Sequence, residues 1–193
     1  MTSRKNGFWA FGITVIMLLT AGSNDSAHAQ RTMSGQDMIT LYGYTPMTGS
    51  KDFGGELCWG RYMLDSYWKV KADAESASHR LKTGHTMNAC TVTLGSSYMH
   101  RLACTRSRSV SLYAGGGIFI GYEIYDPSKK LPKYINTGLP AGNFLYGINA
   151  NIEGEFFILK TLALVVYAEL PVNFSSPLSK VRYRAGAGIR INL

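Results

Sequence analysis

A strict alternation of side chains over residues 181–193 limits what this chain can fold into. Apolar residues occupy every odd position, and arginine, glycine or asparagine occupies every even one. A period of two places the two sets on opposite faces of a β-strand. The run is longer than an ordinary strand of about 5–6 residues and exceeds the roughly 9–11 that a tilted strand needs to cross a bilayer. Because it reaches the last residue of the sequence, it is typical of the closing strand of an outer-membrane β-barrel.

The same alternation predicts seven further strands. Four segments show it strongly and three more weakly: 68–75, 110–123, 144–155 and 162–170, then 36–45, 54–63 and 86–101. Ala163 and Val165 blur the pattern in one of them. None of the segments carries the 3.6-residue stripe of an amphipathic helix. The expected fold is therefore all-β, an eight-stranded antiparallel up-and-down outer-membrane barrel.

The predicted connections differ in length between the two ends of such a barrel. Four fall on the side away from the first strand's start, at 46–53, 76–85, 125–142 and 173–179, and three fall on the same side, at 64–66, 102–107 and 156–159. The segment 125–142 is the longest of them. Outer-membrane barrels have short periplasmic turns and longer extracellular loops. The asymmetry therefore favours this class, with both ends of the barrel domain on the periplasmic side.

Charged residues gather on the polar faces of the predicted strands. In a barrel these side chains would project into the lumen and pair there: Lys69, Lys71, Glu153, Glu155, Glu169, Arg182, Arg184 and Arg190. An eight-stranded barrel is just wide enough for side chains to fill. Periodicity alone also allows the opposite arrangement, a soluble lipocalin-like barrel with an apolar core. Small residues on the apolar faces, such as Ala114 with Gly116 and Ala185 with Ala187, fill a core poorly and favour contact with lipid.

The first residues have the order of a secretory signal peptide. Arg4 and Lys5 precede an apolar stretch over residues 8–21, and the small-residue site Ala27-His28-Ala29 follows. We expect cleavage between Ala29 and Gln30, which makes residues 1–29 the signal and 30–193 a single barrel domain. The alternative is an uncleaved anchor, but the apolar stretch is shorter than the about 20 residues of a spanning helix.

The net charge of +8 raises the question of nucleic-acid binding. Basic residues are scattered over loops and lumen faces, and no zinc finger, helix-turn-helix or RNP-like pattern accompanies them. We therefore expect no sequence-specific nucleic-acid partner. Outer-membrane lipid, whose anionic headgroups attract basic side chains, is the expected surrounding.

Catalytic, cofactor-binding and metal-binding residues are not predicted. The four histidines, His28, His79, His85 and His100, lack metal-ligand spacing, and no G-x-S-x-G, H-E-x-x-H or P-loop occurs. The run Gly115–Gly117 with Gly121 is expected to let a strand bend or bulky neighbours pack over it. The sequence therefore predicts a protein that is not an enzyme and holds no cofactor.

Three cysteines belong to the expected mature chain. Cys58, Cys90 and Cys104 are an odd number, so at most one intramolecular disulfide can form. Buried, unreactive thiols are the preferred interpretation, with one bridge as the alternative.

The order of several short motifs resembles the TraO family of conjugative transposon proteins. The matching features are, in order, Ala29-Gln30-Arg31, Gly121-Tyr122-Glu123, Leu131-Pro132, then Phe144, Tyr146 and Gly147 running into Glu153 and Glu155, and finally Gly186-Ala187-Gly188-Ile189-Arg190. The similarity is best over 109–193. The segment 169–172 departs from the family pattern, which bears on the fourth outer loop.

This resemblance implies a non-enzymatic outer-membrane component of a conjugative DNA-transfer apparatus, with other transfer proteins as partners. A docking or scaffold role follows, because an eight-stranded lumen is too narrow for DNA. The favoured contact surface is the long loop, where aromatic anchors and charge combine in Tyr125, Lys129, Lys130, Lys133 and Tyr134. Two alternatives are a stand-alone OmpX-like adhesin or protective barrel, and a soluble periplasmic ligand-binding barrel.

Overall fold

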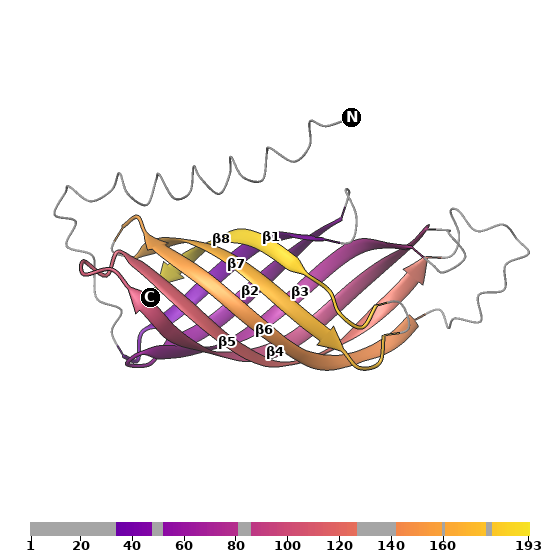
Figure 1. The fold of residues 1–193 in the computed structure, drawn as a ribbon, viewed down its shortest axis with the longest axis horizontal. Coiled ribbons are helices and arrows are strands. Elements are labelled where there is room, and N and C mark those ends of the chain that lie inside the picture. The colour runs from indigo at the N-terminus through magenta and orange to yellow at the C-terminus, as the bar shows by residue number, and fades with distance from the viewer. Residues whose placement is uncertain (1–33, 48–51, 81–85, 127–141, 160, 177–178) are drawn as a thin grey trace, which may run out of the picture.

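Eight antiparallel strands form one closed barrel in the computed structural model (Figure 1). The model describes residues 34–47, 52–80, 86–126, 142–159, 161–176 and 179–193. The strands are β1 (Asp37–Pro46), β2 (Phe53–Tyr62), β3 (Ser66–Arg80), β4 (Thr86–Cys104), β5 (Val110–Asp126), β6 (Gly142–Phe157), β7 (Leu162–Asn173) and β8 (Arg184–Asn192). Within those residues, no helix has the length and apolar character needed to span a membrane.

Each strand pairs with the next along the chain, and β8 pairs with β1 to close the ring. Thr40 of β1 lies opposite Arg190 of β8 at this seam. All eight strands predicted from the period-two pattern are present, so the predicted up-and-down topology is confirmed.

The charged side chains of the strands point mainly into the barrel, and most large aliphatic ones point out. Lys69 and Glu153 are 1 % and 0 % exposed, whereas Leu57 and Ile118 are 54 % and 67 % exposed. Adjacent residues alternate in this way along most of each strand, with a break at the β4 bulge between Arg101 and Ala103. This is the pattern expected for a wall between lipid and a filled lumen. The lipocalin-like alternative, with its apolar faces turned inward, is therefore wrong.

Bulky inward side chains lie opposite inward glycines on the neighbouring strand. Tyr42 faces Gly188 across the β1–β8 seam, and Phe119 of β5 faces Gly147 of β6. A Cβ atom at Gly147 would lie 2.1 Å from the carbonyl oxygen of Val172. A side chain at such a position would push the strands apart, so glycine there permits close packing.

The two ends of the barrel differ in the length of their connections. The near end carries the start of β1 and Leu193, and the far end carries the opposite strand ends. Near-end connections are the short turns at 63–65, 105–109 and 158–161. Strands β3 to β6 are the long ones, at 15, 19, 17 and 16 residues, against 10, 10, 12 and 9 for the others. The far rim therefore slants, and the two long hairpins project at the right of Figure 1.

Several predicted boundaries need correction. β5 continues to Asp126, so Tyr125 belongs to a strand and not to the long loop. The closing strand begins at Arg184 and not at Val181, which makes only an isolated bridge to Val172. Pro171 explains the late start. Its carbonyl accepts the Arg182 N–H at 3.0 Å, but proline has no N–H to return the second hydrogen bond of the pair.

Candidate functional site

The lumen contains a column of charged and hydroxyl side chains above an apolar plug. The plug lies at the near end and consists of Met38, Tyr62, Tyr67, Met99 and Tyr113, all between 0 % and 1 % exposed. Tyrosine rings from β3 and β5 meet edge to face in it, with the Tyr67 and Tyr113 centroids 4.9 Å apart. These side chains fill the near end of the barrel.

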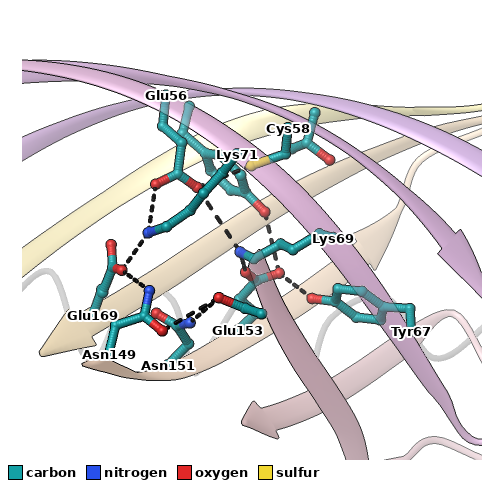
Figure 2. A network of polar contacts seen from close by, with 12 residues as sticks. Glu56, Cys58, Tyr67, Lys69, Lys71, Asn149, Asn151, Glu153 and Glu169 are labelled. Carbon is teal, nitrogen blue, oxygen red and sulfur yellow. Dashed lines mark hydrogen bonds and ion pairs between the residues drawn. The ribbon is translucent and has the colours of Figure 1, made fainter. Parts of the chain in front are cut away.

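Arg190 organises the lowest charged layer, just above the plug. Its guanidinium lies 2.8 Å from Glu153 and 3.3 Å from Glu155. Lys69 also pairs with Glu153, and the Tyr67 hydroxyl donates to the same carboxylate (Figure 2). Side chains from β3, β6 and β8 therefore meet across the lumen.

Lys71 is at the centre of the next layer. Figure 2 shows its ammonium group between Glu56 of β2 and Glu169 of β7, with 3.2 Å to the nearer Glu56 oxygen. The Cys58 thiol donates to Glu56 at 3.0 Å, and the Asn149 amide donates to Glu169 at 2.7 Å. This layer joins opposite walls of the barrel.

Two arginines of the β8 region form the upper layer, toward the far end. Arg184 lies 2.7 Å from Glu75 and 3.4 Å from Asp73. Arg182 pairs with Glu123 and lies 3.5 Å from Glu75. Both Glu75 oxygens lack a hydrogen-bond donor among the described residues, so charge attraction holds them more than aligned hydrogen bonds do.

Carboxylates outnumber cations in this column. Seven acids and five bases take part in its ion pairs: Glu56, Asp73, Glu75, Glu123, Glu153, Glu155 and Glu169, with Lys69, Lys71, Arg182, Arg184 and Arg190. Neutral donors make up part of the difference, since tyrosine hydroxyls and one thiol also donate to the carboxylates. An unpaired buried charge is strongly destabilising, so this pairing lets the lumen remain packed.

The arrangement suits structural packing better than the passage of a polymer. Charged groups from opposite walls meet in the lumen, in layers that leave no route for a polymer as wide as DNA. Among the described residues, no group of three or more His, Cys, Asp or Glu side chains is placed to hold a metal ion.

All eight charges predicted to face the lumen do so. Seven of them pair within the predicted set, whereas Arg182 pairs with Glu75 and Glu123, which were not in it. Sequence reasoning missed Glu56, Asp73, Glu75 and Glu123 as members of the column. Their signal was present, because each lies at a polar position of an alternating segment.

Of the five predicted partner-binding residues, the structure describes only Tyr125. Tyr125 is 5 % exposed, and its hydroxyl donates to Glu123 at 2.9 Å, so its ring is part of the far lumen and not an exposed anchor. Lys129, Lys130, Lys133 and Tyr134 lie outside the described residues, as does the predicted cleavage site at Ala29 and Gln30.

The three cysteines are free, so no bridge links them. Cys58 is buried as expected, but the prediction is wrong for Cys90 and Cys104, which are exposed. Cys90 lies at an outward position of β4, and Cys104 follows a bulge between Arg101 and Ala103 at the near rim. Alternation places Cys90 outside the barrel, whereas Cys104, opposite the buried Ser111, is exposed because it lies at the rim.

A closed eight-stranded wall with an apolar exterior and a charged lumen defines an outer-membrane-type β-barrel. Solved structures of this class share the fold. Neisserial surface protein A matches at 14 % identity, TM-score 0.56, over 82 % of this chain and 95 % of that one. OprG of Pseudomonas aeruginosa matches at 8 %, TM-score 0.54, over 86 % and 98 %. Ail, the attachment invasion locus protein of Yersinia pestis, matches at 12 %, TM-score 0.52, over 83 % and 100 %.

A comparison with family models gives a more specific assignment than the fold class does. Residues 30–193 match the model of the conjugative transposon protein TraO, and the chain belongs to that family. This confirms the resemblance seen in the order of motifs. No curated protein matches the chain.

Proposed function

We propose that this chain is a non-enzymatic outer-membrane component of a conjugative transfer apparatus and acts by docking or scaffolding other transfer proteins. The observation that carries the proposal is membership of the TraO family over the whole barrel domain, residues 30–193. The filled lumen supports docking over transport, because ion pairs from opposite walls occupy the space a conduit would need.

Location and orientation belong to the same proposal. Residues 1–29 direct export and are removed after Ala29, and the apolar exterior then enters the outer membrane. The near end, with its short turns, faces the periplasm, and the far end faces outward, as the usual asymmetry of these barrels requires. The partners are lipid around the wall and transfer proteins at the two ends.

Residues 127–141 supply the outward contact surface in this proposal. Deleting them tests that part separately from the rest. Reduced transfer with normal barrel assembly would support it, and unchanged transfer with normal assembly would rule the loop out.

Transfer frequency is the deciding measurement for the function as a whole. A donor lacking the gene is compared with one complemented by the full chain, and barrel assembly is checked by membrane fractionation. Loss of transfer that the full chain restores supports the proposal. A donor that transfers normally without the gene contradicts it, and an attachment or protective phenotype in cells without transfer genes would favour the stand-alone barrel.

A further inference from the structure

The turn at 105–109, between β4 and β5, is an ordered structure at the near end. The Thr105 N–H donates to the Val110 carbonyl at 2.9 Å, and the Arg108 N–H donates to the Thr105 carbonyl at 2.9 Å. Hydroxyl groups reinforce it, with the Ser107 and Ser109 Oγ atoms 2.7 Å apart. The turn therefore holds its two exposed arginines, Arg106 and Arg108, in defined positions.

These two arginines have no ion-pair partner among the described residues. No aspartate or glutamate occurs between Leu94 and Tyr122. Two exposed aspartates of the near end are already paired, because Asp37 pairs with Arg61 at 2.6 Å and Asp65 pairs with Arg101. The near end thus carries uncompensated positive charge at one turn.

The backbone of Arg108 adopts a conformation that is unfavourable for an arginine. Its φ of 58° is in the left-handed region, where glycine or asparagine is favoured. Such a backbone costs on the order of 1–3 kcal/mol, and residues of this kind cluster at functional sites. A charged side chain at this position calls for a role outside folding.

Exposed leucines lie beside the same strand end. Leu64 of the 63–65 turn is 79 % exposed, and Leu102 in the β4 bulge is 61 % exposed. Arg101 ties the two segments together, because its N–H donates to the Asp65 carbonyl at 2.9 Å and its guanidinium to the Leu64 carbonyl at 3.4 Å. Apolar side chains beside a charged rim are the usual composition of a protein docking surface.

The distance between the 105–109 turn and the membrane favours a protein partner over lipid headgroups. Trp59, Trp68 and Tyr98 form an outward aromatic group, and such groups lie at the membrane interface. β4 continues about six residues beyond Tyr98 and ends at Cys104. At about 3.3 Å per residue and a tilt of about 40°, the turn lies about 15 Å further out. The headgroup layer is only about 5–7 Å thick.

We propose that Arg106, Arg108, Leu64 and Leu102 form a docking surface for an acidic, partly apolar segment of a periplasmic protein. This deepens the proposed function and rests on its placing of the near end in the periplasm. Opposite charge would guide the segment to the arginines, and the leucines would be covered in the bound state.

Binding is measured with the full barrel in zwitterionic nanodiscs and a fluorescein-labelled peptide of alternating glutamate and leucine. The double variant Arg106→Gln/Arg108→Asn removes the charge and gives residue 108 a side chain that tolerates its φ. We expect about tenfold weaker binding for the double variant and a marked weakening of wild-type binding in high salt. The control Arg61→Gln, an exposed near-end arginine outside the surface, should bind like the wild type.

Equal binding by the wild type and the double variant would overturn the inference. So would tighter capture of phosphatidylglycerol vesicles than of the peptide through the same arginines, because that result identifies a lipid surface. Circular dichroism and gel mobility of both variants establish that the barrel is intact.

Transfer assays separate this inference from the proposed function. If deleting the gene abolishes transfer but the double variant transfers normally, the docking surface is wrong and the transfer role stands. If the deletion has no effect, the transfer role itself is wrong. Loss of transfer in the double variant, with Arg61→Gln normal, supports both.

Discussion

Arg190 shows how a single buried residue joins distant parts of the wall. Its guanidinium lies 2.8 Å from Glu153, and its Nε donates to Thr40 of β1 at 2.9 Å. A second nitrogen donates to the Tyr42 hydroxyl at 2.9 Å. Strands β1, β6 and β8 are therefore linked through one side chain at the closing seam.

Replacing Arg190 should be severely destabilising. Arg190→Ala leaves Glu155 without its cation and Glu153 with only Lys69, and breaking a buried pair costs about 3–5 kcal/mol. The free energy of unfolding, measured by urea titration in lipid vesicles, should fall by that amount. Arg61→Ala, which breaks the exposed pair with Asp37, should cost less than about 1 kcal/mol. Similar losses for the two variants would contradict the assigned role.

Replacing Arg108 by glycine should stabilise the protein, in contrast to replacing Arg190. Arg108→Gly removes the conflict between an L side chain and a φ of 58°, so the free energy of unfolding should rise by about 0.5–1 kcal/mol. The same urea titration measures this change, with Arg106→Gly as the matched variant. A loss of stability at residue 108 would show that its side chain supports the turn.

At the scale of the strand, glycines determine how closely neighbours approach. Gly147→Ala would place a methyl group 2.1 Å from the Val172 carbonyl and against the Phe119 ring, so β6 must shift. We expect a loss of about 1–3 kcal/mol and slower assembly, seen as a smaller fraction of the fast-migrating folded form on unheated gels. Gly43→Ala is the control, because nothing lies within 4 Å of its added Cβ. Equal effects at both positions would contradict the packing argument.

The strands were largely predictable from the sequence, because a period of two follows directly from a wall with unlike faces. Ala163 and Val165 were harder, since both are apolar and yet buried on the lumen side. Alternation cannot assign a face when both sets are apolar. The late start of β8 depends on a hydrogen bond that Pro171 cannot donate. The end of β5 was marked in the sequence by Pro127, directly after Asp126, but the predicted strand stopped at 123 because the alternation was followed only that far.

The sequence predicts which charged residues belong to the lumen column better than it predicts which of them pair with each other. Charges on lumen faces can be listed from the sequence, but Lys71 meets Glu169 only because strand tilt and stagger bring β3 and β7 to the same height. Such offsets accumulate around the ring and are not encoded in any one segment. The positive charge of the turn at 105–109 is visible in the sequence as Arg106 and Arg108. The positive φ of Arg108 and the absence of an ion-pair partner among the described residues could be seen only in the fold.

For the whole molecule, the plug and the column predict a barrel that does not conduct. The purified chain in planar bilayers should show no steady ion conductance, because the plug residues Met38, Tyr62 and Met99 close the near end and paired charges fill the space above. The folded form should still migrate faster than the boiled form on denaturing gels. Recovery in the soluble periplasmic fraction, or stable open-channel currents, would contradict this account.

The sealed near end also bears on the bacterium that houses such a barrel in its outer envelope, as proposed. Wider barrels of about 16–18 strands leave an aqueous channel that small solutes can enter. A wall closed by Tyr67, Tyr113 and their neighbours admits none of these. A barrel filled in this way adds no entry route for small solutes to the membrane that holds it.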